Sequence, residues 1–522
     1  MNTMIEITSL DGKREGMFHH GETSCTFPGL LTFRKDSMSW GALSIEKPLS
    51  YPFRSHLHGT GLSVTPLLRV YPGAPPGVAR RLQEANASLR EGGDVTTVFL
   101  SGYDDIDTAF VRSLNESKLF LFDLREERAF LRHFFMLRKR YPNAVSYVDC
   151  PPETVPVLAY AGVDIFPDTP QHRAELASFL EDPTPHYVEM RACASLCAKR
   201  LLDLLYHEFW GEHEPYVATP DDQELFISSD SFWRPTVRRW EREVSTNYVP
   251  PSNVCVLLPC SARKPYSSSQ SHKTFIASMR KALRSRYPSL TQLIVTSPYG
   301  VVPRELETLI DYDTVVTGRW SHDEVERSRT MVRTILEKME DPFVIAHLPE
   351  NEQAILDGLP CDVKVTCDGH PLSAPSMRAL EDTLRSVADR IDTAAKSHAH
   401  MRTLSRFLYG TDVFGEDIRI KGRGVKQVYE GSSCVASFDK TIRPFSTHAP
   451  IRRRWVSMMD FDLKGDLFCV GIEDADDDIR PGDEVVITRN GEMVASGKAL
   501  LPGHMMSRMR RGKAVKVKKR CG

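Results

Sequence analysis

Residues 254–272 decide the fold of the central part of the chain and read VCVLLPCSARKPYSSSQSH. The apolar run 254–258 is typical of a buried strand, and Pro259 places Cys260 at its tip. The serine-rich segment that follows contains Pro265, which suits neither a strand nor a helix interior, so it is predicted to be a loop. A strand, a polar loop and then a helix are the arrangement in which α/β proteins place their chemistry.

The chain then alternates between helix and strand patterns up to about residue 370. The patterns predict strands at 254–258, 293–296, 314–317, 343–346 and 363–366, and helices at 273–287, 303–310, 321–339 and 352–358. Such alternation is typical of a parallel sheet covered by helices, where ligands bind outside the carboxyl ends of the strands. The predicted ends carry Cys260, residues 297–300, residues 318–320 and His347. This edge of the sheet is therefore predicted to form a pocket.

The composition is that of an ordinary globular protein with a local concentration of charge. The chain has 522 residues, of which 41% are hydrophobic and 26% charged, and its formal net charge is −2. A chain of this length is expected to hold about three or four domains. Residues 503–522 contain eight Lys or Arg and no acidic residue, which indicates a basic face unless the segment is a solvated tail.

Cysteine usage and hydropathy indicate a cytoplasmic protein with reduced thiols. The 11 cysteines include no C-x-x-C pair. Charged residues within the first twenty positions exclude a signal peptide, and no apolar run approaches the ~18 residues of a membrane span. The sequence therefore predicts no membrane association and no disulfide framework.

Strand patterns also occur toward both ends of the chain. Residues 98–100, 119–122 and 145–148 are predicted strands between helical stretches, which indicates a larger α/β domain such as a barrel. A polar helical stretch at 377–400 leads to a small all-β module, in which 489–492 is predicted to be a hairpin turn.

Cys260 is the leading candidate for a reactive group. Arg263, Lys264 and His272 are predicted to lower the pKa of its thiol, because cations stabilise a thiolate. A cysteine beside a histidine base is a common pair in covalent catalysis. The alternative is a buried cysteine that only packs at a strand end. The polar residues behind it favour chemistry, because buried polar groups destabilise a fold unless they are paired or used.

Other candidate residues have two interpretations. Two Cys/His groups lack the spacing of a zinc site, and their cysteines are interpreted as ordinary core cysteines: Cys193, Cys197 and His207, and Cys361, Cys367 and His370. Glu305 could act in catalysis, although an acidic first turn is also typical of helix capping, which we favour. Arg319 and Trp320 could hold a carboxylate and stack a base, or form an ordinary structural pair.

Several motifs resemble those of one known family. The arrangement P-C-x3-K-P-Y-x2-S-x2-H resembles the signature of the archaeosine synthases, archaeal tRNA-modifying enzymes related to tRNA-guanine transglycosylases. It is met here by Pro259, Cys260, Lys264, Pro265, Tyr266, Ser269 and His272. Residues 297–307 and 317–320 are similar to the catalytic domain of that family. Residues 465–468, 479–485 and 511–515 resemble a PUA domain, a small RNA-binding β-barrel.

The N-terminal part resembles a diverged transglycosylase barrel at residues 147–152 and 160–166. The parent enzymes carry an aspartate nucleophile in a D-S-G-G-type motif and a C-x-C-x-x-C zinc site, and this sequence contains neither. Base exchange is therefore not expected, and the barrel is interpreted as a relic that contacts RNA or partners.

Together these features predict a multidomain α/β protein. We expect a diverged (β/α) barrel of transglycosylase type, a parallel α/β catalytic domain, a small linking domain and a C-terminal β-barrel PUA domain. The expected boundaries, in that order, are 1–245, 246–375, 376–447 and 448–522.

The resemblance implies a specific reaction. The family acts on 7-cyano-7-deazaguanine at position 15 of tRNA and adds the side-chain amine of free L-lysine to the nitrile. A radical-SAM partner enzyme then cleaves the resulting amidine to archaeosine. We expect no cofactor and no metal in this chain, and homo-oligomerisation is left open. Two alternatives remain, an amidotransferase that uses glutamine or ammonia on the same tRNA nitrile and a non-catalytic tRNA-binding subunit.

The resemblance and the weak electrophilicity of a nitrile together suggest residue roles. Cys260 is expected to add to the nitrile carbon and form a thioimidate, which the lysine amine displaces. His272 would move protons near neutral pH, and Lys264 would stabilise the thiolate. Tyr266 and Ser269 would donate to the nitrile nitrogen or orient the base. In the rival mechanism the amine attacks directly and Cys260 only lines the pocket.

The remaining candidates are expected to bind rather than react. The predicted substrate-binding residues are Arg263, Tyr299, Arg319 and Trp320. The predicted RNA-binding residues, which should neutralise phosphates, are Arg508, Arg510, Arg511, Lys513, Lys516 and Lys518.

Overall fold

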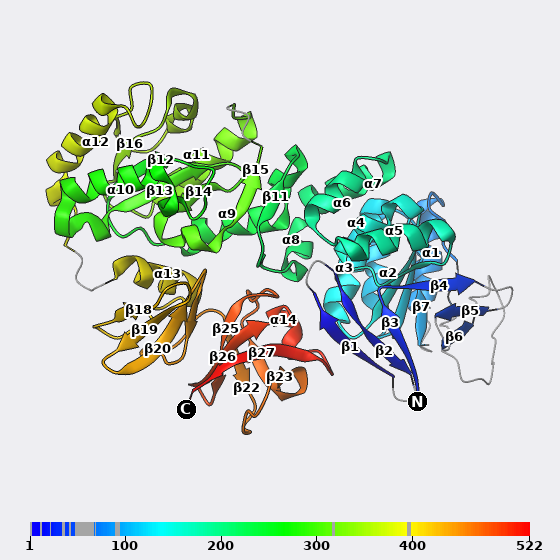
Figure 1. Ribbon diagram of the computed structural model, residues 1–522. Helices are drawn as coiled ribbons and strands as arrows, with labels where there is room; N and C mark the ends of the chain where they lie inside the picture. The colour runs from blue at the N-terminus through cyan, green and yellow to red at the C-terminus, as the bar shows by residue number, and fades with distance from the viewer. Residues whose placement is uncertain are drawn as a thin grey trace. The chain divides into compact units, whose positions relative to one another are not determined.

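The computed structural model describes residues 3–10, 13–20, 22–33, 37–40, 43–46, 67, 69–88, 94–315, 319–393 and 398–521. The chain forms two compact units (Figure 1). The first contains Met1–Thr219, Asp462–Gly482 and Ala499–Lys516, and the second contains Pro220–Phe461, Asp483–Lys498 and Val517–Gly522. No helix among the described residues is long and apolar enough to cross a membrane.

The first unit contains a mixed seven-stranded sheet in the order β6-β5-β4-β10-β9-β8-β7. Its parallel strands are β4 (Gly29–Phe33), β10 (Ile165–Pro167), β9 (Val145–Asp149), β8 (Leu119–Asp123) and β7 (Val95–Thr97). The antiparallel strands β5 (Ser37–Trp40) and β6 (Leu43–Glu46) extend it. A separate antiparallel sheet contains β1 (Thr3–Ser9), β2 (Glu15–His20) and β3 (Thr23–Phe27).

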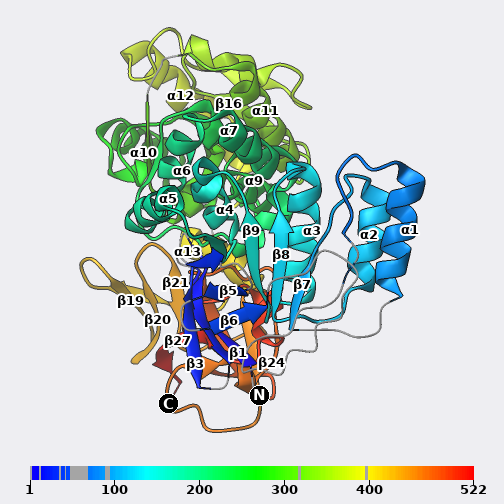
Figure 2. The same ribbon diagram turned by 90° about the vertical axis from the view of Figure 1, so that its right-hand side faces the viewer.

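Helices follow the parallel strands in turn, as in a half-barrel of β/α units, and Figure 2 shows β7, β8 and β9 side by side with α2 and α3 near them. The helices of this unit are α1 (Pro76–Ala87), α2 (Asp104–Ser113), α3 (Glu127–Arg140), α4 (Val155–Ala161), α5 (Pro170–Glu181), α6 (Pro185–Ala192), α7 (Leu196–Asp203) and α8 (Trp210–His213). The α/β fold expected for the N-terminal part is confirmed. The strand expected at 98–100 lies instead at 95–97, before an extended segment.

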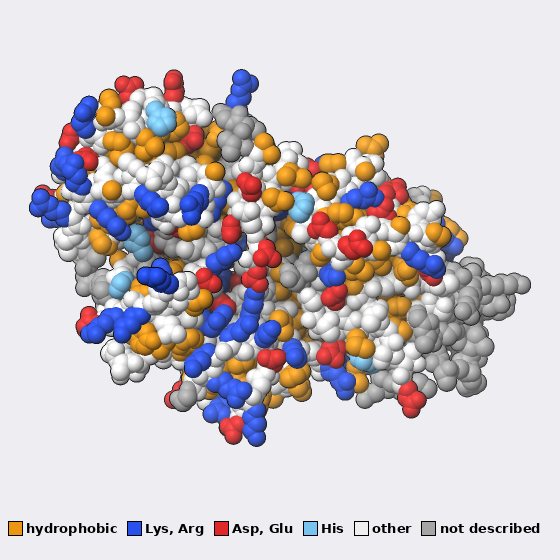
Figure 3. All heavy atoms as spheres, in the orientation of Figure 1, with side chains coloured by type: hydrophobic (Ala, Val, Ile, Leu, Met, Phe, Trp, Pro, Cys, Tyr) orange, Lys and Arg blue, Asp and Glu red, His pale blue; other side chains and the backbone are white. Residues whose placement is uncertain are grey.

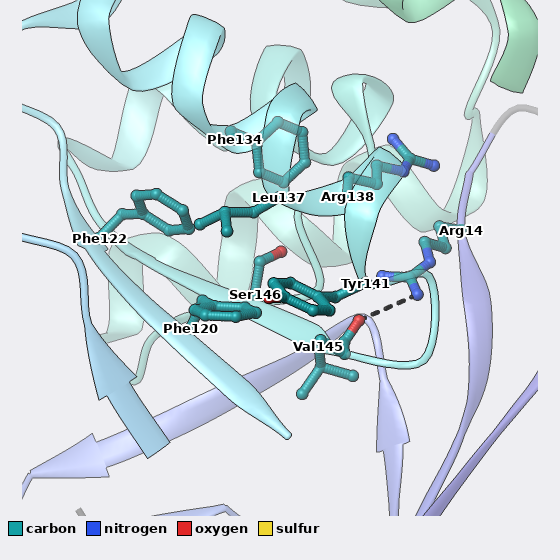
Figure 4. Close-up of a pocket in the computed structure, with 10 residues that line it drawn as sticks. Arg14, Phe120, Phe122, Phe134, Leu137, Arg138, Tyr141, Val145 and Ser146 are labelled. Atoms are coloured by element: carbon teal, nitrogen blue, oxygen red, sulfur yellow. Dashed lines mark hydrogen bonds between the residues drawn. The ribbon is translucent and has the colours of Figure 1, made fainter. Parts of the chain in front are cut away.

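The first unit contains a buried ion pair between two residues that are distant in the sequence. Arg14 Nη1 lies 2.6 Å from Asp164 Oδ2, and Asp164 also accepts from the Ser146 backbone N–H at 2.8 Å. Arg14 donates to the Ala144 carbonyl at 3.2 Å and lines a small cavity together with Arg138 and aromatic side chains (Figure 4). None of the residues lining this cavity is a predicted site residue.

The second unit contains a five-stranded sheet in the order β14-β13-β12-β16-β17. Its parallel strands are β12 (Val254–Pro259), β13 (Thr291–Thr296), β16 (Phe343–Ala346) and β17 (Val363–Val365), and β14 (Gly300–Pro303) returns antiparallel to β13. The main helices are α9 (Pro235–Asn247), α10 (Gln270–Leu283), α11 (His322–Leu336) and α12 (Ala374–Ser386). The parallel α/β fold predicted for this region is confirmed.

Strand β12 is apolar on both faces because helices cover both. Val254, Val256 and Leu258 belong to one core with residues of α10 and α12. Cys255 and Leu257 belong to a second core with residues of α9 and α11. A strand covered in this way is a continuous apolar run rather than an alternating one, which explains why its sequence pattern could be recognised.

Part of the predicted alternation differs from the structure. The strand predicted at 314–317 is misplaced, because β15 (Tyr312–Thr314) pairs with β11 (Glu224–Phe226) in a small sheet of its own. Residues 316 and 317 of that prediction lie outside the described residues. The polar loop and the strand ends before Cys260 and His347 lie where the sequence predicts them, whereas Arg319 and Trp320 follow no strand of the main sheet in the part of the chain that the structure describes.

The short helices predicted in this unit take a tighter form. Residues predicted as helices at 303–310 and 352–358 form the 3-10 helices Arg304–Leu309 and Glu350–Leu356. Helix α10 begins three residues earlier than predicted, since Ser269 accepts the His272 backbone N–H and caps its first turn.

The chain continues with α13 (Ala399–Tyr409) and two β-modules. The first is an antiparallel sheet of β18 (Arg419–Lys421), β19 (Lys426–Glu430), β20 (Ser433–Phe438) and β21 (Ile442–Pro444). The C-terminal sheet has the order β23-β27-β26-β25-β22-β24. It contains β22 (Trp455–Met458), β23 (Leu467–Phe468), β24 (Ile472–Ala475), β25 (Glu484–Arg489), β26 (Glu492–Ala499) and β27 (Lys513–Arg520), and α14 (Gly503–Met506) accompanies it.

The hairpin between β25 and β26 confirms the predicted turn at 489–492. Asn490 and Gly491 have φ angles of 52° and 82°. Positive φ at both central residues is the requirement of a type I′ turn, which Asn-Gly satisfies better than other dipeptides.

Candidate active site

Cys260 follows β12 at the carboxyl edge of the five-stranded sheet and is exposed. Many protein atoms nevertheless surround its sulfur, so loss of hydration raises the pKa of the thiol, and the charge of Glu352 raises that pKa further. A hydrogen bond with Thr296 and the Lys264 ammonium oppose this only in part. The prediction that neighbouring cations lower the pKa of this thiol is therefore wrong, because burial outweighs them.

A network of hydroxyl groups lies next to Cys260. Tyr266 is fully buried, and its hydroxyl donates to Thr296 Oγ1 at 3.2 Å and lies 2.8 Å from the Tyr312 hydroxyl. Thr296 and Tyr312 are also hydrogen-bonded to each other. Each hydroxyl can both donate and accept, so the network can orient an atom that reacts at the Cys260 sulfur.

Lys264 joins the same group of side chains. Its Nζ lies 3.8 Å from the centroid of the Tyr312 ring, a cation–π distance. Burial lowers the pKa of the Lys264 ammonium, whereas the charges of Cys260 and Asp313 raise it. The structure therefore brings together Cys260, Lys264 and Tyr266 of the predicted catalytic set.

Ser269 and His272 of that set hold the loop in place. His272 is fully buried, and its Nδ1 accepts a hydrogen bond from Arg304 Nη2 at 2.8 Å. Arg304 Nη1 donates to Glu307 at 2.9 Å, and Glu307 accepts the Ser267 backbone N–H at 3.0 Å. Together with the Ser269 cap, these contacts fix the polar loop against its neighbours.

His272 does not titrate near neutral pH, contrary to the prediction. Burial and the neighbouring Arg304 charge lower the pKa of His272 to about 3, while the Pro259 carbonyl acts weakly in the opposite direction. Because Nδ1 accepts a hydrogen bond, the neutral ring carries its proton on Nε2. The side chain is therefore suited to positioning the loop rather than to moving protons.

The predicted substrate-binding residues have different environments. Arg263 and Arg319 are exposed, and Trp320 is half-buried against the core. Tyr299 is only 4% exposed, and its hydroxyl donates to the Glu224 carboxylate. Burial and the Glu224 charge raise the pKa of Tyr299 well above its ordinary value. The Tyr299 hydroxyl is therefore engaged with Glu224, and substrate binding by Tyr299 stays a prediction.

Four residues of the site were not identified from the sequence, namely Thr296, Arg304, Tyr312 and Glu352. Thr296 is the last residue of β13, so the rule that ligands bind at strand ends could have found it. Tyr312 and Glu352 come from a separate strand and a 3-10 helix, and their proximity to Cys260 depends on the packing of distant segments.

Glu305 and the two Cys/His groups give no evidence of a second centre. Burial raises the pKa of Glu305 to about 7, and its Oε2 accepts a hydrogen bond from the Tyr248 hydroxyl at 3.1 Å. Among the described residues, no group of three or more His, Cys, Asp or Glu side chains is arranged to hold a metal ion.

The predicted RNA-binding residues fall into two classes. Arg511, Lys516 and Lys518 are exposed, and Figure 3 shows Lys and Arg side chains gathered over the C-terminal strands. The others contact the protein: Arg508 donates to the Arg140 carbonyl at 3.2 Å, Arg510 to Glu116 at 2.9 and 3.0 Å, and Lys513 lies 3.2 Å from Asp466. All six residues are exposed, but Arg508, Arg510 and Lys513 already contact other residues of the chain, so the remaining three are better placed to meet phosphates.

Known proteins match both the site and the C-terminal module. A domain of unknown function (DUF5591) matches residues 237–384, and a PUA domain matches residues 458–520. The archaeosine synthase subunit alpha of Thermococcus kodakarensis is 32% identical over 463 residues, 78% of this chain and 80% of the relative. The archaeosine synthase of Methanocaldococcus jannaschii is 33% identical over 305 residues, 54% of this chain and 52% of the relative.

A crystal structure of AF0587, a protein of unknown function, aligns with 54% of this chain and 99% of its own length, at 24% identity and a TM-score of 0.42. The fold and the matches together define a multidomain α/β protein with a C-terminal PUA domain. The chain belongs to the archaeosine synthase family.

Proposed function

We propose that this chain is a tRNA-modifying enzyme of archaeosine biosynthesis and that its substrate carries 7-cyano-7-deazaguanine at position 15. In this proposal it transfers free lysine, through the side-chain amine, onto the nitrile and leaves an amidine adduct. A radical-SAM partner would then cleave that adduct. Membership of the archaeosine synthase family supports the pathway, and the reactive groups at the edge of the second unit support the chemistry.

The observation that carries the proposal is the environment of Cys260. A thiol at a strand end, with a hydroxyl network at Thr296 and an ammonium at Lys264, provides a nucleophile, hydrogen-bond donors and a positive charge. A nitrile needs all three, because negative charge develops on its nitrogen when the carbon is attacked.

The roles of the side chains follow from their positions. Cys260 sulfur adds to the nitrile carbon, and the lysine amine then displaces it. Lys264 stabilises negative charge, and Tyr266 acts through the hydroxyls of Thr296 and Tyr312. Ser269 and His272 position the loop that carries the reacting groups.

The C-terminal module is proposed to hold the tRNA. A PUA domain matches residues 458–520, and the exposed cations of β27 and the preceding loop are suited to phosphates. Substrate recognition and chemistry would then reside in different parts of the chain, as the proposed domain boundaries at 246–375 and 448–522 imply.

The decisive experiment is mass spectrometry of nucleosides from tRNA that carries 7-cyano-7-deazaguanosine, after incubation with the purified protein and labelled lysine. We expect a labelled lysine adduct without the radical-SAM partner. If an adduct forms only with glutamine or ammonia, that compound and not lysine is the nitrogen donor. Tight tRNA binding without any adduct would contradict an enzymatic role and leave a tRNA-binding subunit.

A further inference from the structure

Glu352 lies at the same sheet edge as the reactive thiol. Strands β12 and β16 are parallel neighbours, and the His347 backbone N–H donates to the Leu257 carbonyl at 3.0 Å, so the two strands end together. The chain then enters the 3-10 helix Glu350–Leu356, which the fully buried Ile355 anchors in the core. The backbone around Glu352 is therefore fixed beside the end of β12.

The Glu352 carboxyl acts on two thiols from different strands. Its charge raises the pKa of Cys260, after β12, and that of Cys367, after β17. Since β16 lies between β12 and β17 in the sheet, a carboxyl that follows β16 can act on thiols that follow both of its neighbours. Its Oε2 atom is buried and has no hydrogen-bond partner among the described residues. An unpaired buried acceptor is unfavourable, and it is suited to take a proton.

The protonation behaviour of Glu352 agrees with this geometry. Burial raises the pKa of the Glu352 carboxyl to about 7, so near neutral pH it can both accept and release a proton. The Glu352 charge acts on the Cys260 and Cys367 thiols, and the Lys264 ammonium also acts on Cys260. His272 is less suited to this role, because Arg304 occupies its Nδ1, and burial together with the Arg304 charge lowers its pKa to about 3.

We propose that Glu352 is the proton carrier of this site. Its carboxylate takes the proton from the Cys260 thiol and delivers it to the nitrile nitrogen. This inference rests on the function proposed above. In the first step the S–H bond breaks, an S–C bond forms, and the nitrogen receives the electron pair and the proton. In the second step the lysine amine forms the N–C bond and expels the sulfur, and Glu352 passes the surplus amine proton back to it. Atoms and charge balance without an oxidant or reductant.

The first test compares three variants in the lysine-adduct assay. We expect Glu352→Gln to slow adduct formation on the order of 100-fold, as loss of a general acid–base group does. Glu352→Asp should recover part of the rate, because it keeps a carboxyl group. Glu350→Gln is the matched control, since Glu350 is exposed on the same 3-10 helix, and it should react like the unmodified protein.

The second test measures Cys260 alone. Iodoacetamide alkylation is followed between pH 6 and 9 by peptide mass spectrometry, which separates Cys260 from the other cysteines. In Glu352→Gln the alkylation midpoint should move to lower pH, because the charge that raises the thiol pKa is gone. Faster alkylation combined with slower adduct formation is the signature of a proton carrier, and a packing defect would not produce this opposition.

Two outcomes would overturn the role of Glu352. One is an adduct rate in Glu352→Gln equal to that of Glu350→Gln, and the other is an unchanged alkylation profile. Failure of the proposed function gives a different result, in which the unmodified protein forms no adduct with any donor. In that case the alkylation profile still decides whether the Glu352 charge acts on the Cys260 thiol.

Discussion

The hydroxyl groups of Tyr266 and Tyr312 lie 2.8 Å apart, and both are hydrogen-bonded to Thr296. The two tyrosines come from the loop after β12 and from β15, 46 positions apart in the sequence. Both side chains are buried, so water does not compete for their hydrogen bonds, and such networks are stronger than exposed ones. Their shared partner Thr296 also reaches the Cys260 thiol.

Replacing Tyr312 by Phe should slow tRNA modification by about 10- to 100-fold and lower the free energy of unfolding by about 1 kcal/mol. The hydroxyl that is lost serves both Tyr266 and Thr296. Adduct formation and urea unfolding measure the two effects. Tyr248→Phe is the control, since its buried hydroxyl donates to Glu305. Equal slowing in both variants would mean that Tyr312 acts only through stability.

Replacing Cys260 by Ser should abolish detectable lysine transfer, because the hydroxyl is a far weaker nucleophile than a thiol at this pH. Cys193→Ser, which changes an exposed cysteine of the first unit, should leave the rate unchanged. Nucleoside mass spectrometry checks both variants. Near-normal turnover of Cys260→Ser would instead support direct attack by the amine.

The buried His272 should make the protein less stable in mild acid. Its pKa is lowered to about 3 in the folded state, so below the ordinary value of about 6.5 the unfolded state binds the proton more readily. The contribution of neutral His272 to the free energy of unfolding is complete above pH 6.5 and is lost as the pH falls toward 3. The part that is lost between pH 7 and pH 5 is about 2 kcal/mol.

Urea unfolding at pH 7 and pH 5 tests this expectation. The variant His272→Asn keeps an acceptor for Arg304. From pH 7 to pH 5 its free energy of unfolding should fall by about 2 kcal/mol less than that of the unmodified protein. His370→Asn changes an exposed histidine and serves as the control. An identical pH dependence in all three proteins would contradict a neutral, buried His272.

Among the predicted RNA-binding residues, Arg511, Lys516 and Lys518 should contribute most to tRNA affinity. Lys516→Ala and Lys518→Ala should each reduce the slope of log affinity against log salt by roughly 0.7 to 0.9. Arg510→Ala should change the slope less, because Arg510 is paired with Glu116. Filter binding across a salt series measures the slopes. A larger effect of Arg510→Ala would reverse the assignment of the RNA-binding surface.

The extent to which the site could be predicted varies with the type of pattern. The apolar run of β12 and the Asn490-Gly491 turn were predicted correctly, because each depends on residues that are adjacent in the chain. The short segments around Arg304 and Glu352 were predicted as helices of unspecified type and form 3-10 helices. Segments this short take their form from packing rather than from propensity.

The amino-acid sequence by itself determined the strand, the polar loop and the identity of the groups at the loop, since apolar runs and turn residues act locally. Only the tertiary structure decided the chemical state of those groups. The strand order β13-β12-β16 brings Thr296 and Glu352 to Cys260, and burial lowers the pKa of His272 while raising that of the thiol. Strand order and burial depend on contacts between distant segments, and no local pattern of residues encodes them.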